Sequence, residues 1–95
     1  MQNSEIAAVF NDIAEMLGLK KDNIFKIRAY QKVARAITEL SLPVEQLVSE
    51  NRLNEIPGAG EAITKKITEL VTTGKLDYYE RLKAEFPERA RSARA

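Results

Sequence analysis

The sequence predicts an all-α fold, a compact single domain of four to five short helices, and two observations carry this prediction. Apolar residues recur at spacings of three and four along almost all of the 95 residues, as they do on the buried face of amphipathic helices. No segment shows the strict alternation of apolar and polar residues that is typical of half-buried strands. A chain of this length has room for one modest core, so one domain is expected.

The first two predicted helices carry most of the apolar residues. Asn3 or Ser4 is expected to cap the first helix, and Gly18 is expected to end it. Its apolar stripe consists of Ile6, Val9, Phe10, Ile13, Met16 and Leu17. The second helix is predicted from about Ile24 to Leu40, and its inward residues are Ile27, Tyr30, Val33, Ala34 and Ile37.

Three shorter helices complete the predicted fold. Pro43 suits the first position of a third helix, which carries Val44, Leu47 and Val48, because its fixed φ matches a helix start. A fourth helix begins after Gly60 and stops at Gly74. The fifth helix is carried by Leu76, Tyr79, Leu82 and Phe86 and ends at Pro87. The domain is therefore expected over residues 1–87, followed by a basic, flexible tail at 88–95.

The composition excludes several kinds of chemistry. The sequence contains neither cysteine nor histidine, which excludes disulfides, thiol and imidazole catalysis, and the usual zinc sites. No apolar run approaches the ~20 residues of a membrane span, and the first five residues lack the basic start of a signal peptide. We therefore expect a soluble, cytoplasmic protein with no membrane partner, no cofactor and no metal bound by side chains.

The basic residues are concentrated although the formal net charge is only +1. Residues 20–35 contain Lys20, Lys21, Lys26, Arg28, Lys32 and Arg35. Arg28, Lys32 and Arg35 share the face of the second helix that is opposite its apolar stripe. Most such rows are merely solvated. Here only Glu39 is placed to neutralise the cations, so the row is a candidate surface for a phosphate backbone.

The most informative segment is LNEIPGAG at residues 53–60, which leads directly into a helix. Pro57 presets a turn. Gly58 and Gly60, on either side of Ala59, are expected to adopt positive φ and to let another molecule approach closely. The helix start leaves backbone N–H groups unpaired at the positive end of the helix dipole. This arrangement predicts an anion site, and the hairpin carbonyls could also hold a monovalent cation.

Residues 53–67 resemble a helix-hairpin-helix element, the DNA-binding hairpin of repair and replication proteins that does not read base sequence. The segments NIFKIRAYQKVARAI at 23–37 and TGKLDYY at 73–79 are similar to its flanks in the amino-terminal domain of family X DNA polymerases, the DNA polymerase beta family. The similarity runs from about residue 6 to residue 87. It implies an all-α domain with one helix-hairpin-helix motif that binds gapped or duplex DNA through phosphates, in repair or replication.

The resemblance also implies roles for individual residues. In that family the positions of Lys26 and Tyr30 help to form a pocket for a 5′-phosphate at a DNA gap. The plainer alternative for Tyr30 is core packing with its hydroxyl at the rim, and for Lys26 a stem that passes the core with its head in water. Phe25 could stack on a base or sugar, although an aromatic residue at a helix start more often packs locally. Lys65 is expected to point to solvent as a further DNA contact.

Lys66 is the candidate catalytic residue. The resemblance places it where repair members of the family carry the lysine that forms a Schiff base with a 5′-deoxyribose phosphate. It borders an apolar stripe, and a lysine beside apolar surface and other cations can lose its proton and act as a nucleophile. However, boundary lysines are usually structural stems with solvated heads. Ala62 and Tyr78 replace basic residues of the lyase-competent relatives, and Glu61 adds an acid beside the expected phosphate site, so we expect a DNA binder more than a lyase.

The sequence also limits the function in one respect and leaves one alternative function open. Family X polymerases carry their metal-binding carboxylates and nucleotide site in later domains, for which this chain has no room, so it is not a polymerase by itself. A contrasting hypothesis is a protein-interaction module that has kept the fold but lost DNA affinity, acting through its basic helix or its tail. Glu61 and Ala62 favour that hypothesis, and the sequence identifies no protein partner.

Overall fold

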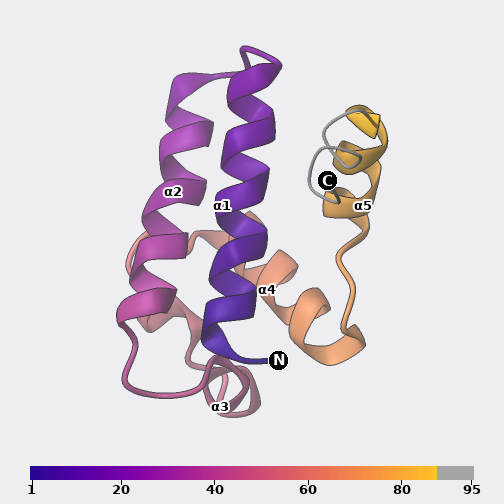
Figure 1. The fold of residues 1–95 in the computed structure, drawn as a ribbon. Helices are drawn as coiled ribbons and strands as arrows, with labels where there is room; N and C mark the ends of the chain where they lie inside the picture. The colour runs from indigo at the N-terminus through magenta and orange to yellow at the C-terminus, as the bar shows by residue number, and fades with distance from the viewer. Residues whose placement is uncertain (88–95) are drawn as a thin grey trace.

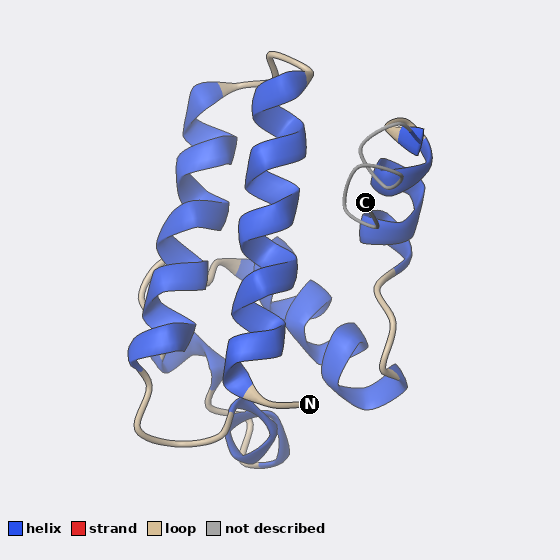
Figure 2. Ribbon diagram, viewed as in Figure 1, coloured by secondary structure: helices blue, strands red, loops and turns tan. Residues whose placement is uncertain are grey.

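A computed structural model describes residues 1–87 of the chain, and all regular structure within these residues is helical. The elements are α1 (Asn3–Leu19), α2 (Ile24–Glu39), α3 (Val44–Ser49), a 3₁₀ turn η1 (Leu53–Glu55), α4 (Glu61–Thr73) and α5 (Asp77–Ala84). Figure 2 shows these helices joined by short loops. The predicted all-α fold is therefore confirmed.

The core is built on an antiparallel pair formed by α1 and α2, with α5 beside α1 on the side away from α2 (Figure 1). The apolar stripes predicted for the first two helices face each other in this pair, and nearly all of their residues are buried. Residues of α3, the hairpin and α4 complete the same cluster, including Leu47, Ile56 and Ile67. The second helix therefore presents its basic row outward, because its opposite face is committed to the core.

The ends of α1 differ from the prediction. Gln2 caps the helix in a capping box with Glu5, whose carboxylate accepts from the Gln2 N–H at 2.9 Å. Asn3 is already helical, and its amide instead donates to the Leu42 carbonyl and accepts from the Val44 N–H, both at 2.8 Å. This residue ties the start of α1 to the loop before α3, a contact between segments that are distant in sequence.

Gly18 does not end α1, which continues to Leu19. The left-handed closing residue is Lys21, with φ of 58°, and the Asp22 N–H donates to the Leu17 carbonyl at 3.0 Å. This backbone closure satisfies the final carbonyls without a glycine, which is why the glycine is not needed as a stop.

The later helices follow the prediction with shifted ends. Pro43 is the residue before α3 and is not its first helical residue, and α5 ends at Ala84, short of Pro87. Gly74 ends α4 with φ of 77°, as predicted. The prediction of a basic tail falls on residues 88–95, which lie outside the described part of the chain.

Two polar contacts attach α5 to α1. The Tyr79 hydroxyl donates to the Asp12 carboxylate at 2.7 Å, and Lys20 forms an ion pair with Glu85 at 3.0 Å. The Tyr79 contact matters for the site because it holds the first turn of α5, which also carries Tyr78, in place.

Candidate nucleic-acid interface

The hairpin turns between η1 and α4 through backbone hydrogen bonds. The Ala59 N–H donates to the Ile56 carbonyl at 3.0 Å, and the Gly60 N–H donates to the Gly58 carbonyl at 3.1 Å. Gly58 has φ of 84°, which favours glycine, whereas Gly60 has φ of −75° and extended ψ. The prediction of positive φ is therefore correct for Gly58 and wrong for Gly60, because the turn is completed before the chain reaches Gly60.

The two glycines also differ in what surrounds them. A Cβ atom added at Gly58 would lie 3.1 Å from Cδ of Lys32, so this glycine lets the hairpin pack on the stem of a basic-row lysine. A Cβ atom added at Gly60 would meet no protein atom within 4 Å. Gly60 is therefore not required by the fold, and its missing side chain leaves open space beside the start of α4.

The start of α4 provides unpaired donors at that open space. Gly60 is the N-cap residue of α4, and no side chain of the described residues forms a capping hydrogen bond there. The first helical hydrogen bond runs from the Thr64 N–H to the Gly60 carbonyl at 2.9 Å. Helix geometry leaves the N–H groups of the three preceding residues without partners inside the helix. Glu61 lies in this first turn and pairs with Lys65 at 3.5 Å, so part of the Lys65 charge is already compensated.

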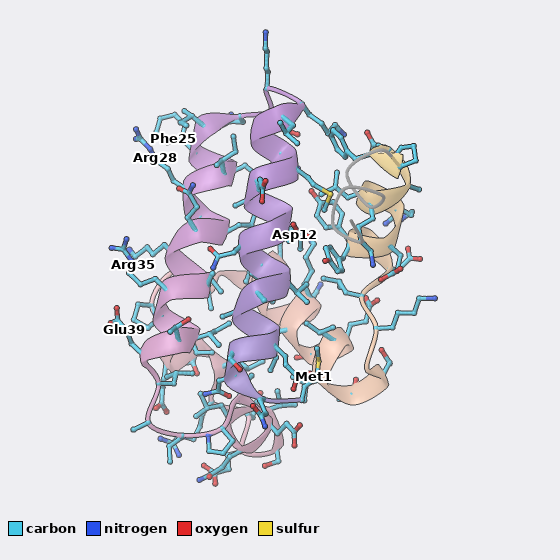
Figure 3. The ribbon with its side chains drawn as sticks, in the orientation of Figure 1. Met1, Asp12, Phe25, Arg28, Arg35 and Glu39 are labelled. Atoms are coloured by element: carbon cyan, nitrogen blue, oxygen red, sulfur yellow. The ribbon has the colours of Figure 1, made fainter. Side chains whose placement is uncertain are left out.

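The basic row adjoins the hairpin at one end. Arg28, Lys32 and Arg35 are exposed and form no ion pair with another described residue, and Figure 3 shows Arg28 and Arg35 projecting from α2 away from α1. A shallow pocket of about 410 Å³ lies between α2 and the hairpin and is lined by Lys32, Arg35 and Pro57, among others. We call Lys32, Arg35, Pro57, Gly58 and Gly60, with the first turn of α4, the hairpin surface.

A second group of predicted residues gathers at another place, the groove between α4 and α5. This groove has a volume of about 550 Å³, and Ala62, Lys66, Leu76 and Tyr78 help to line it. The Lys66 ammonium lies 4.8 Å from the centre of the Tyr78 ring, and the Lys26 ammonium lies 5.7 Å from the same centre. The Tyr78 ring therefore lies close to both ammonium groups. The sequence did not reveal this position of Tyr78, because it depends on how α5 packs.

The pKa of Lys66 is lowered by its surroundings. Partial burial is the largest cause, and the positive charges of Lys26 and Arg81 act in the same direction, while Glu69 opposes them. A lowered pKa means that the neutral, nucleophilic amine exists at lower pH than for a lysine in water. Lys65, one residue earlier, is exposed as expected.

Lys26 and Tyr30 differ in exposure although both lie near the Tyr78 ring. Tyr30 is only 4% exposed and stacks with Phe10 and Tyr78 at ring distances of 6.0 and 6.3 Å, so it occupies the core. Burial, helped by Tyr78, raises the pKa of the Tyr30 hydroxyl. Lys26 is exposed, and its ammonium lies 4.0 Å from the Asp22 carboxylate, which fits the alternative of a stem that passes the core with its head in water.

Two other kinds of feature are absent from residues 1–87. These residues contain no cluster of three acidic, histidine or cysteine side chains placed to hold a metal ion. None of the described helices is both long and apolar enough to cross a membrane.

Comparison with known proteins agrees with the geometry of the hairpin. A family model described as a helix-hairpin-helix domain matches residues 1–76, which include α1 to α4 and the link to α5. Comparison with curated proteins finds no match. Because the model covers most of the 95 residues, the chain belongs to the helix-hairpin-helix domain family.

Proposed function

We propose that this domain binds DNA through backbone phosphates and does not read base sequence. Helix-hairpin-helix domains generally bind nucleic acid, which supports a DNA-binding role. The observation that carries the proposal is the open space at Gly60, beside the unpaired N–H groups at the start of α4. The same hairpin packs through Gly58 on the stem of Lys32 in the basic row.

The binding mechanism follows from the donors on the hairpin surface. One phosphate would accept hydrogen bonds from the N–H groups at the start of α4, where the helix dipole favours an anion. Lys32 and Arg35 would contact a neighbouring phosphate of the same strand. Main-chain donors and flexible cations that contact phosphates do not face base edges, so affinity should be independent of sequence. Glu61 places a negative charge beside the phosphate and keeps the affinity modest.

The experiment is a titration of intact duplex, 5′-phosphorylated gapped duplex and single-stranded DNA with wild-type protein and a Gly60→Val variant. The added side chain meets nothing in the protein but occupies the phosphate approach, so affinity should fall about tenfold or more, the equivalent of one hydrogen bond to a charged group. Gly18→Val is the matched control, because that glycine also has open space but lies away from the hairpin.

Two outcomes would contradict the proposal. If Gly60→Val is folded by circular dichroism and binds DNA like wild type, the hairpin is only a turn. If the wild-type protein binds no DNA form at low salt, the interaction-module hypothesis replaces DNA binding altogether.

The proposed link to repair or replication, and to family X polymerases, rests on the sequence resemblance. A preference for gapped over intact duplex in the same titration would support it, because a gap presents the 5′-phosphate that the Lys26 and Lys66 region would receive. Equal affinity for both forms would favour general duplex binding.

A second candidate function, 5′-deoxyribose-phosphate lyase activity, is favoured by the lowered pKa of Lys66 in the open α4–α5 groove. The neutral amine would attack the aldehyde carbon of the ring-opened sugar, and loss of water would give an imine. Borohydride reduces such an imine to a permanent bond between protein and DNA. The Tyr78 ring opposes this step, because its face stabilises the charged ammonium.

We expect little borohydride trapping with the wild-type protein and more with Tyr78→Lys, which restores a basic residue and removes the ring. Trapping that is lost in Lys66→Ala but kept in Lys65→Ala would assign the lyase reaction to Lys66. If Lys66→Ala does not change the trapping, another amine reacts, and the role that the family resemblance implies for Lys66 is wrong.

A further inference from the structure

Three of the four exposed large apolar side chains among the described residues lie at one end of the molecule, and the fourth, Met1, lies at the N-terminus. Leu19, Ile24 and Phe25 are 57%, 51% and 74% exposed and occupy the end of α1 and the start of α2. Figure 1 places this turn at the far end of the helical pair from the N-terminus, and Figure 3 shows Phe25 there. We call these three residues the apolar knob.

The knob is held by a well-bonded turn. The Asn23 side chain accepts from the Phe25 N–H at 2.8 Å, and the Lys21 N–H donates to the Gly18 carbonyl at 3.0 Å. The exposed apolar groups are thus presented by an ordered backbone, so little conformational entropy is lost when they bind.

A complementary pocket lies at the opposite end of the same helical pair. It has a volume of about 380 Å³, and its apolar lining is supplied by Met1, Leu40, Leu42 and Pro43. Because α1 is 17 residues long, the knob and this pocket are ~25 Å apart and cannot meet within one molecule. We call it the terminal pocket.

The two ends carry opposite charge. Beside the knob, four cations (Lys20, Lys21, Lys26 and Arg28) stand against two acids, Asp22 and Glu85. At the pocket end, five acids (Glu5, Glu39, Glu45, Glu50 and Glu55) stand against Arg52 and the terminal amine. Some of these charges form internal pairs, but Lys21 and Arg28 at one end and Glu39 at the other form no ion pair within the described residues. An approach of knob to pocket is therefore favoured by charge.

We propose that copies of this chain associate head to tail, with the apolar knob of one copy in the terminal pocket of the next. The surfaces differ, so the contact is heterologous, and a row of copies keeps a free knob at one end and a free pocket at the other. The three knob side chains make a small contact, so association is weak and is favoured by low salt. This association goes beyond the proposed DNA binding and does not depend on it.

The test is sedimentation velocity at low salt, without DNA, over micromolar to millimolar concentrations. The average mass of wild-type protein should rise with concentration. Phe25→Ser removes the main knob side chain, and Ser41→Lys places a cation in the terminal pocket facing the basic knob end, so each variant alone should stay monomeric. Phe25→Leu, which keeps an apolar knob, and Ser49→Lys, which adds the same charge outside the pocket, should associate like wild type.

A mixture of the two monomeric variants gives the decisive result. Ser41→Lys keeps an intact knob and Phe25→Ser keeps an intact pocket, so the mixture should form one-to-one dimers and nothing larger. A monomeric wild type at all concentrations, a monomeric mixture, or association of Ser41→Lys alone would overturn the proposal. If the wild type is monomeric and Phe25→Ser loses affinity for single-stranded DNA, the knob is a base-stacking surface, which also overturns it.

Discussion

Lys66 and Tyr78 decide what the α4–α5 groove can do at the residue scale. Burial and the neighbouring cations favour the neutral amine of Lys66, whereas the Tyr78 ring, 4.8 Å from the ammonium, favours the charged form. Lys26 lies near the same ring, and its positive charge lowers the pKa of Lys66. A basic residue in place of Tyr78 would add positive charge and remove the ring.

Lys26→Ala should raise the pKa of Lys66, because it removes a positive charge that lowers it. The amine is neutral above its pKa, so the variant should need a higher pH to reach the same neutral fraction. An NMR titration of the Lys66 side-chain resonances measures this shift. Lys65→Ala is the control, since Lys65 is not among the groups that perturb Lys66. An unchanged titration in Lys26→Ala would show that the two lysines do not interact in solution.

At the scale of elements, α5 is an attached helix that completes the groove. The helix-hairpin-helix match ends at residue 76, one residue before α5 begins. Its buried anchor is Leu82, and its polar contacts to α1 are the Tyr79–Asp12 hydrogen bond and the Lys20–Glu85 ion pair. The hydrogen bond is partly buried and the ion pair is exposed, so the hydrogen bond should contribute more to docking.

Tyr79→Phe should weaken the docking of α5 by about 1 kcal/mol, the usual net value of one hydrogen bond. Hydrogen exchange should therefore become faster in the amides of α5, with a smaller change in α1 and α2. Glu85→Gln, which removes the exposed ion pair, should have less effect. Equal acceleration in all helices would show that α5 opens only when the whole domain unfolds.

At the scale of the whole molecule, the groups that we propose as DNA contacts on the hairpin surface are few. They are the unpaired N–H groups at the start of α4 and two cations of α2, Lys32 and Arg35, and Arg28 extends the basic row along α2. Without Arg28, Lys32 and Arg35 the rest of the chain has a formal net charge of −2, because the whole chain has +1. Affinity should therefore depend on a small number of phosphate contacts and not on a general attraction to DNA.

The affinity for DNA should fall as the salt concentration rises. A plot of log K against log[salt] should have a slope of about −3, the value expected when roughly three phosphates are neutralised. Lys32→Gln should make this slope shallower by about 1, because one contact is lost. Lys75→Gln, an exposed lysine outside the hairpin surface, should leave the slope unchanged. Affinity that does not depend on salt would contradict the phosphate-contact mechanism.

The sequence by itself determined the helices, most of the core and the place of the hairpin. Periodic residues such as Phe10, Val33 and Ile67 specify which helix faces are buried, and Gly58 and Gly74 mark turns because their local backbone requires them. These features depend on neighbours a few residues away, so they can be predicted from a single chain.

Only the tertiary structure decided which residues meet. The Lys32 stem under Gly58 joins segments that are separate in sequence, and so does the Tyr78 ring near Lys26 and Lys66. The open space at Gly60 exists because no other described segment packs there. Asn3 likewise serves the loop before α3 and does not cap its own helix. Helical periodicity specifies the face on which a residue lies, but the partner on that face depends on how whole helices pack, and no local pattern encodes that packing.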